Sequence, residues 1–230
     1  MAWATAVVEC IERLRANGYP APRYLAPFDL DGSVVLVQER ARGQWSDDVD
    51  SSLVTKLLSV NDLQAGLGQP GSDWRDYIVM TLTEGADGYC LHQTLRDGGS
   101  ETASVLDWIR SVGHSVNKLP QGDLVHLDFH HRNVLQADNG TIAVVDLEGC
   151  QSGDRAFDLV TLGIYLDDAR TPPSSEPAVW ARAVQLASPE TLRAYVAHMV
   201  LRRLDWTQRV HPEDLTRALL VVHDYMRRVD

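Results

Sequence analysis

The central stretch at residues 124–135, LVHLDFHHRNVL, places polar side chains between two apolar ends. Asp128 is followed five positions later by Asn133, and Asp146 comes thirteen positions after Asn133, at the end of the apolar run TIAVV. Carboxylate and amide oxygens are the ligands that hard cations such as Mg²⁺ prefer. If residues 134–148 form a hairpin, Asn133 and Asp146 converge on one cation, and Asp128 is free to orient a hydroxyl. That combination is the equipment for phosphoryl transfer.

Other kinds of site remain open for the same stretch. A transition-metal site would use His126, His130 and His131, although no cysteine or second histidine cluster lies at ligand spacing. A Ser/His/Asp hydrolase would need a G-x-S-x-G elbow, which the sequence does not contain. The plainest alternative, three solvated turn residues, is disfavoured because order, spacing and flanking strand patterns all agree.

The composition of the chain indicates which kinds of molecule it can bind. The 230 residues carry a formal net charge of −11, which disfavours nucleic acid and anionic membranes and suits, weakly, a cationic small molecule. The three scattered cysteines form no disulfide framework, so a reducing cytoplasmic location is expected. No apolar run approaches the ~20 residues of a membrane span, and the start lacks the basic segment of a signal peptide.

Hydrophobic periodicity predicts an α+β chain with two unequal lobes. The predicted elements are a helix at 3–17, a strand hairpin within 20–40, a helix at 49–66, a helix capped by Ser100, a hairpin at 133–148 and helices from 156 onward. Residues 74–97 are hard to assign. We expect a partial N-lobe at 1–42, with its hinge near 38–42, and a C-lobe at 43–230.

Three ordered motifs add a resemblance to these patterns. The segments HLDFHHRNVL, VVDLEGC and GDRAFDLVTL resemble the aminoglycoside phosphotransferase and choline kinase-like family, which shows an H-G-D-x-H-x-x-N-V-L loop, an aspartate-aromatic-(Asp/Glu) motif and a G-D-x-x-x-D-L helix start. The match is dense over about 36 residues. One departure is Leu127, where glycine is common. The resemblance implies a protein-kinase-like fold with catalytic loop 126–133, metal motif 146–148 and a helical substrate subdomain at 156–230.

The resemblance also implies roles for individual residues. They are Asp128 as catalytic base; Asn133 and Asp146 as Mg²⁺ ligands; Glu148 in the metal shell or on the substrate; His126 and His130 as loop supports; Asp158 as a brace; Gln38, Glu39, Arg40 and Ala41 as a hinge offering backbone groups to adenine; and, more weakly, Asp167 and Asp168 as substrate contacts.

The beginning of the chain departs from the family pattern. No lysine precedes Lys56, and no glycine-rich loop precedes the first helix. The sequence therefore predicts a truncated N-lobe, and a fragment, a misplaced start and a natural short form all remain open. Loss of a phosphate-binding lysine should cost orders of magnitude in rate. An exposed edge of the N-lobe sheet is a candidate for self-association.

These observations predict a small-molecule kinase with Mg²⁺ and ATP or GTP. It would transfer the γ-phosphate to a hydroxyl of a small cationic substrate. An aminoglycoside fits best, which would make the chain an antibiotic-resistance enzyme; choline, a sugar and homoserine stay open. The first alternative is a truncated, catalytically weak kinase-like module that binds or regulates. The second is a metal-binding hydrolase that uses the histidines.

Overall fold

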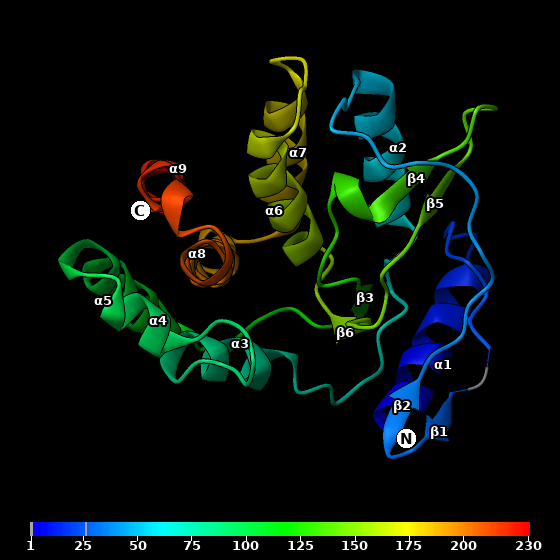
Figure 1. Cartoon of the computed structure of the whole chain (residues 1–230), viewed down its shortest axis with the longest axis horizontal. Helices are drawn as coiled ribbons and strands as arrows, with labels where there is room; N and C mark the ends of the chain where they lie inside the picture. The colour runs from blue at the N-terminus through cyan, green and yellow to red at the C-terminus, as the bar shows by residue number, and fades with distance from the viewer. Residues whose placement is uncertain (1, 26) are drawn as a thin grey trace. The chain divides into compact units, whose positions relative to one another are not determined.

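The computed structural model describes residues 2–25 and 27–230, and the chain forms two compact units (Figure 1). Unit 1 comprises Met1–Ser72 and Gln121–Gln185, and unit 2 comprises Asp73–Pro120 and Leu186–Asp230. The predicted hinge at 38–42 falls inside unit 1, so the division into lobes stays a prediction that these units do not test. Residue 26, part of the predicted first strand, lies outside the described residues.

Unit 1 holds all the strands of the described chain and four of its helices of two turns or more. Its elements are α1 (Ala2–Ala16), β1 (Phe28–Leu30), β2 (Ser33–Val35), α2 (Ser51–Asp62), β3 (Asp123–Val125), η1 (His131–Asn133), β4 (Val134–Gln136), β5 (Ile142–Val144), β6 (Gln151–Gly153), α6 (Ala156–Tyr165), η2 (Leu166–Asp168) and α7 (Ser175–Leu186). Short strands joined by helices fit the predicted α+β class.

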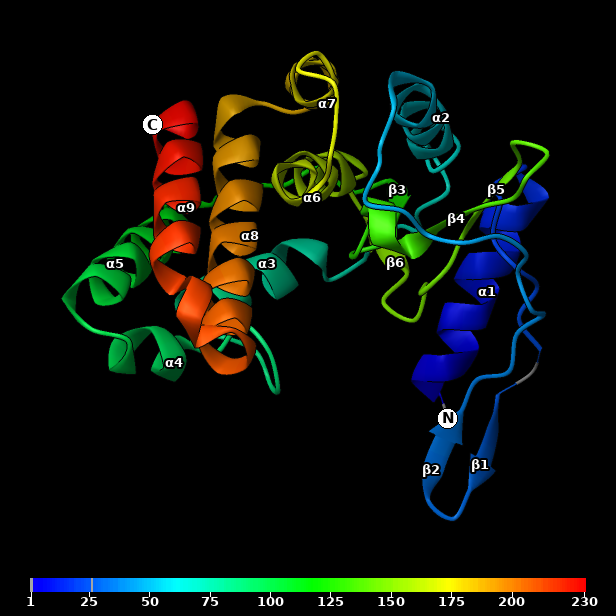
Figure 2. The same cartoon turned by 45° about the horizontal axis from the view of Figure 1, so that its top comes forward.

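The predicted N-terminal hairpin forms, with strands shorter than expected. β1 and β2 pair antiparallel, Phe28 opposite Val35. Two further backbone bonds extend the ladder: Leu25 N–H donates to the Val37 carbonyl at 2.7 Å, and Glu39 N–H donates to the Arg23 carbonyl at 2.8 Å. The strands are exposed, and the hairpin extends away from the other strands of unit 1 (Figure 2).

Two more strand pairs build the centre of unit 1. β4 and β5 form the predicted hairpin, with Leu135 opposite Ala143. β3 pairs antiparallel with β6, which the polar sequence QSG did not reveal. The segment 126–133 leaves β3 for β4, and the segment 145–150 leaves β5 for β6. The predicted catalytic loop and the predicted metal motif therefore both connect the β3–β6 pair with the β4–β5 pair.

Local capping sets where two helices of unit 1 begin. The Asp50 carboxylate accepts a hydrogen bond from Leu53 N–H at 2.7 Å at the start of α2. At the start of α6, Asp154 Oδ1 accepts from Ala156 N–H at 3.0 Å. Asp154 and Asp158 thus sit one helical turn apart, so the GDRAFDL motif fixes the end of β6 and the first turn of α6 together.

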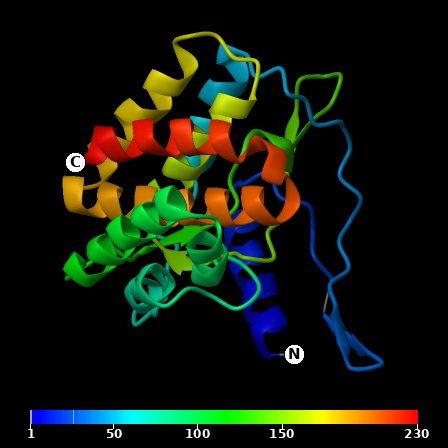
Figure 3. The same ribbon diagram turned by 60° about the vertical axis from the view of Figure 1, so that its left-hand side comes forward.

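Unit 2 is helical and surrounds an aromatic core. Its elements are α3 (Trp74–Thr83), α4 (His92–Asp97), α5 (Ser100–Ser115), α8 (Pro189–Val210), η3 (Pro212–Asp214) and α9 (Leu215–Val229). Figure 3 shows α8 and α9 packed side by side. Trp74 is fully buried and donates from Nε1 to the Tyr195 hydroxyl at 3.1 Å. The predicted cap at Ser100 is wrong, because α5 begins one residue earlier than expected and Gly99 occupies the cap position.

No helix among residues 2–25 and 27–230 is both long enough and apolar enough to cross a membrane.

The segment after the hairpin approaches β4 so closely that a side chain cannot fit. Gln44 and Gln136 exchange backbone hydrogen bonds of 3.0 and 2.9 Å. Gly43 has φ +113°, and a Cβ there would lie 2.6 Å from the Gln136 carbonyl carbon. The approach matters for the site, because β4 directly follows Asn133.

We expect Gly43→Ala to lower the free energy of unfolding by about 2–3 kcal/mol, from backbone strain and a displaced bridge. Gly66→Ala is the matched control, because Gly66 also has positive φ but a Cβ there would meet no atom within 4 Å. It should cost only about 1 kcal/mol. Urea denaturation measures both, and equal losses would contradict the close approach at Gly43.

Candidate active site

The segment that follows β3 is held by one buried carboxylate. Asp158, fully buried on α6, accepts hydrogen bonds from His126 N–H at 2.8 Å and from Leu127 N–H at 3.0 Å. Its two oxygens receive one backbone donor each. Burial raises the pKa of Asp158 to about 7, although these hydrogen bonds lower it. Consecutive backbone amides aimed at one carboxylate fix the direction in which the loop leaves β3.

The backbone of this loop is strained at Leu127. Its φ is +72°, in the left-handed region, where a non-glycine residue costs about 1–2 kcal/mol. This is the position where the resembling family commonly has glycine, and the geometry explains why. Asp158 holds the Leu127 amide in place. Gly149 lies beside it, since a Cβ on Gly149 would be 3.3 Å from the Leu127 Cβ.

His126 joins the loop to the end of β5. Its fully buried imidazole donates from Nε2 to the Val145 carbonyl at 2.9 Å, and Nδ1 accepts from Asp128 N–H at 3.3 Å. These partners fix the tautomer. Burial lowers the pKa of His126, so the ring is neutral. The contacts suit a support and leave neither nitrogen for a metal.

The Asp128 carboxylate has one donor near each oxygen. His130 Nε2 lies 3.3 Å from Oδ1, and Asn133 Nδ2 lies 3.2 Å from Oδ2. His130 Nδ1 accepts from Arg132 N–H at 3.2 Å, so its proton is on Nε2, facing Asp128. The His130 ring also stacks on Tyr165, with centroids 4.3 Å apart. A quarter of the Asp128 side chain remains exposed, which leaves access for a reacting group.

The loop and the 146–148 motif are joined by a second backbone bond. Val145 N–H donates to the Asn133 carbonyl at 2.9 Å. Asn133 Nδ2 is engaged by Asp128, donating also to its backbone carbonyl at 2.9 Å. The Oδ1 atom is therefore the part of Asn133 that can bind a cation. Asp146, next to Val145, has φ +68°, a conformation that aspartate tolerates better than most residues.

Three carboxylates crowd together at this end of unit 1. A hydrogen bond with Glu148, together with partial burial of the carboxyl group and the charges of Glu148 and Asp128, raises the pKa of Asp146 to about 6. Asp146 and Glu148 are both exposed. Such crowding is unfavourable for the bare protein and favourable for a hard divalent cation, so the donor set fits Mg²⁺. The residues that would hold it are Asn133 and Asp146, with Glu148 beside them.

The histidines suit a transition metal less well. His126 is committed at both nitrogens, and His130 accepts at Nδ1 and faces Asp128 with Nε2. Among the described residues, a carboxylate and histidine trio with metal-ligand spacing lies elsewhere, at His211, Glu213 and Asp214, and all three are exposed. These contacts count against the histidine-based hydrolase.

The predicted substrate contacts and hinge residues lie outside this carboxylate cluster, and some of the hinge residues already have backbone partners. Asp167 is exposed and Asp168 is half-buried, both in η2, just beyond the Tyr165 that stacks on His130. In the predicted hinge, Gln38 bridges to Tyr24, and the Glu39 amide is already used by Arg23. The backbone groups of Arg40 and Ala41 therefore remain the candidates for hydrogen bonds to adenine.

Four residues that the sequence did not single out support the site. The Tyr24 hydroxyl hydrogen-bonds with the Leu147 backbone. Asp47 accepts from Arg132 Nε at 3.1 Å and lies 3.4 Å from the buried His131. The other two are Tyr165, against His130, and Gln64, whose amide donates to Asp158 at 2.6 Å. Each is distant in sequence from its partner, and a local pattern gives no signal for such contacts.

We expect Glu148→Gln to stabilise the metal-free protein at about pH 8 and to change it little at about pH 5. The folded-state pKa of Asp146, about 6, lies above its ordinary value of 3.8. The native state therefore keeps a proton that the unfolded chain has lost, and stability falls as pH rises through this window. Glutamine removes the neighbouring charge that causes the loss. Because both groups are exposed, the gain should stay within about 1 kcal/mol.

Urea denaturation at the two pH values measures this effect. Asp138→Asn is the control, since Asp138 is an exposed carboxyl in the β4–β5 turn. The control should behave alike at both pH values. A Glu148→Gln variant no more stable than the parent at the higher pH would contradict the crowding of carboxylates.

Comparison with known proteins assigns the chain to a family. A family model described as the phosphotransferase enzyme family matches residues 4–195. No curated protein matches the sequence. Three solved structures illustrate the likeness in fold: aminoglycoside phosphotransferase APH(4)-Ia with AMP-PNP and hygromycin B (TM-score 0.69, 21% identity, 96% of this chain and 82% of that chain), spectinomycin phosphotransferase APH(9)-Ia with ADP and spectinomycin (0.61, 11%, 96% and 78%) and choline kinase LicA from Streptococcus pneumoniae (0.56, 16%, 94% and 79%).

At these identities the solved structures show the fold, which confirms the predicted kinase-like α+β architecture. The family model spans most of the chain and carries the activity class. The chain is therefore a member of the phosphotransferase enzyme family.

Proposed function

We propose that this phosphotransferase moves the γ-phosphate of ATP or GTP to a hydroxyl of a small cationic molecule, best represented by an aminoglycoside. One observation carries the proposal. Asp128, with a donor at each carboxylate oxygen, lies in the same hydrogen-bonded unit as Asn133 and the crowded Asp146 carboxylate. A base and an oxygen-rich cation site side by side are the two parts that phosphoryl transfer needs.

In this proposal Asp128 is the catalytic base. The acceptor's hydroxyl oxygen bonds to the γ-phosphorus while the bond to the β–γ bridging oxygen breaks, and Asp128 takes the hydroxyl proton. His130 and Asn133 hold the carboxylate in one orientation. Mg²⁺, held by Asn133 and Asp146, would neutralise charge on the nucleotide phosphates.

The choice of a cationic acceptor rests on charge. The chain is strongly acidic, and Asp167 and Asp168 follow the helix that carries Asp158. Their carboxylates would attract the amines of an aminoglycoside. The similar folds include proteins described with hygromycin B and with spectinomycin, as well as a choline kinase, which supports an amine-bearing acceptor. Antibiotic resistance in the cytoplasm would be the corresponding role.

The exposed N-terminal hairpin supports the proposed self-association. Phe28, Leu30 and Val34 are 44%, 56% and 39% exposed. A short apolar hairpin with unpaired outer edges is a place where a second chain can add a strand.

The backbone groups of residues 38–41 would contact the adenine of the nucleotide in the proposed complex.

The decisive variants are Asp128→Ala and Asp146→Ala. Asp128→Ala should abolish transfer and leave nucleotide affinity nearly unchanged, because the base touches the acceptor. Asp146→Ala should lose both transfer and the Mg²⁺-dependent part of nucleotide binding. Asp138→Ala, on the exposed β4–β5 turn, is the matched control and should behave like the parent. Calorimetric titration with ATP and GTP, with and without Mg²⁺, measures binding; transfer of labelled γ-phosphate to a panel of aminoglycosides measures activity.

Retained transfer in Asp128→Ala would overturn the assignment of the base. A folded parent chain that binds neither nucleotide would favour the alternative, a truncated, catalytically weak kinase-like module that binds or regulates. Magnesium-dependent binding in the micromolar range would instead justify a wider acceptor screen.

A further inference from the structure

A buried pair of amides lies behind the catalytic loop, at the C-terminal end of α2. Asn61 and Gln64 are both fully buried. Gln64 Nε2 donates to Asp158 Oδ2 at 2.6 Å, and its Oε1 accepts from Asn61 Nδ2 at 2.7 Å. The same Asn61 nitrogen donates to the Arg155 carbonyl at 2.9 Å. A chain of three hydrogen-bonded side chains therefore runs from α2 to the carboxylate that holds the loop.

The orientation of both amides follows from their partners. If the Gln64 amide were turned round, its oxygen would face the Asp158 carboxylate, and two acceptors would oppose each other. If Asn61 were turned round, its oxygen would face the Gln64 oxygen and the Arg155 carbonyl. In the arrangement present, Asn61 Oδ1 is buried without a partner among the described residues. Buried oxygens without a hydrogen bond are unusual. The arrangement that directs the Gln64 N–H to Asp158 therefore leaves one hydrogen bond of Asn61 unmade.

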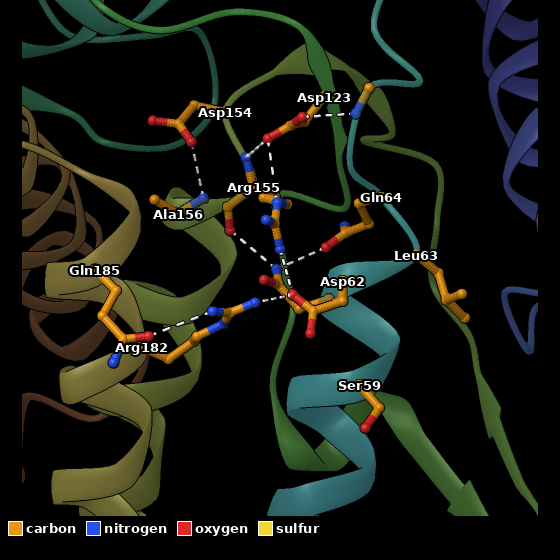
Figure 4. Close-up of polar contacts among 12 residues, drawn as sticks. Ser59, Asp62, Leu63, Gln64, Asp123, Asp154, Arg155, Ala156, Arg182 and Gln185 are labelled. Carbon is orange, nitrogen blue, oxygen red and sulfur yellow. Dashed lines mark hydrogen bonds and ion pairs between the residues drawn. The ribbon is translucent and has the colours of Figure 1, made fainter.

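The end of α2 is itself fixed to the start of α6. Figure 4 shows Arg155 between Asp62 and Asp123, with Arg182 reaching Asp62 from α7. Arg155 Nη1 and Arg182 Nη2 each lie 2.5 Å from Asp62 Oδ1. The Gln64 backbone is also held, because its carbonyl accepts from Leu124 N–H in β3 at 3.1 Å. Gln64 thus reaches Asp158 from an anchored backbone.

We propose that Gln64 is a positioning residue, which fixes the Asp158 carboxylate from outside the loop and so sets where the loop presents Asp128. Of the three N–H groups on Asp158, those of His126 and Leu127 belong to the loop being held. Gln64 supplies the third from a separate element. The consequence for catalysis rests on the proposed function of Asp128.

The charges around Asp158 predict what removal of Gln64 would do. The groups facing Asp158 are the Asp128 carboxylate from the loop, the Tyr19 hydroxyl from the segment after α1 and the Cys150 thiol from the segment before β6. None of them is a cation. Burial raises the pKa of Asp158, the Asp128 charge adds to this, and the Gln64 hydrogen bond opposes it. Without that bond the pKa should rise further, and the carboxyl should carry a proton at neutral pH.

The experiment is a pH titration of the ¹⁵N-labelled full-length chain, followed at the backbone amides of His126 and Leu127. In the parent these amides should report a midpoint near the Asp158 value of about 7. Gln64→Leu keeps the bulk and removes the donor, and it should move the midpoint upward by about one pH unit. Val54→Ala is the control, since Val54 is buried on α2, the helix that ends two residues before Gln64. It should lower stability and leave the midpoint in place.

Kinetics supply the second readout. At neutral pH, Gln64→Leu should lower kcat by about tenfold, shift the acid limb of the kcat profile upward and leave nucleotide KM nearly unchanged. Val54→Ala should change none of these. If the parent transfers no phosphate, the proposed function fails, and the amide titration still measures the contact between Gln64 and Asp158.

An unchanged midpoint in folded Gln64→Leu would overturn the proposal. If that variant does not fold, Gln64→Glu decides, because it matches the shape and replaces the donor with a second carboxyl. Its midpoint should also move upward, and a midpoint equal to that of the parent would overturn the proposal in the same way.

Discussion

The site depends on one buried carboxylate that accepts two consecutive backbone amides. Asp158 binds the N–H groups of His126 and Leu127 from the first turn of α6. When the Asp158 carboxyl is ionised, each hydrogen bond to it contributes about 1.5–3 kcal/mol. Leu127 pays about 1–2 kcal/mol for its left-handed backbone. The bond to Asp158 is strong enough to offset that strain, which explains how the loop keeps its shape although it has leucine where glycine is common.

Hydrogen bonds between neighbouring segments connect the loop held by Asp158 to the rest of the site. His126 reaches the Val145 carbonyl, and Val145 N–H reaches the Asn133 carbonyl. Asp128, the proposed base, and Asn133 and Asp146, the proposed metal ligands, therefore lie on one hydrogen-bonded frame. The same frame places Asp146 near Glu148 and Asp128, and the hydrogen bond with Glu148, partial burial and the two neighbouring charges raise the pKa of Asp146. Crowded carboxylates destabilise the metal-free protein, and a bound divalent cation would relieve their repulsion.

Elements stabilised by contacts between residues close in sequence could be predicted from the sequence alone. The β4–β5 hairpin has an apolar alternation and an ADNG turn, so its position could be predicted from sequence. The contacts that brace the site were missed, because Gln64 meets Asp158 across 94 residues and Asp47 meets Arg132 across 85. An amide at the end of a helix is usually solvated, and nothing in its neighbours reveals a buried partner. β6 was missed for a related reason, since QSG has no strand propensity and is a strand only because β3 lies beside it.

The hydrogen-bonded frame of the candidate site is built without residues of the helical unit 2. Every contact in the frame described above belongs to unit 1, although that unit is built from two stretches of sequence. The chain leaves unit 1 after Ser72 and returns at Gln121, and these two side chains are hydrogen-bonded at 3.0 Å. Nearby, Gly68 N–H donates to the Gly122 carbonyl at 2.8 Å. Because the exit and the return are tied together inside unit 1, the intervening helices can change in sequence or length without moving β3. The frame that holds Asp128, Asn133 and Asp146 can therefore stay unchanged while these helices diverge, because its hydrogen bonds are all made inside unit 1.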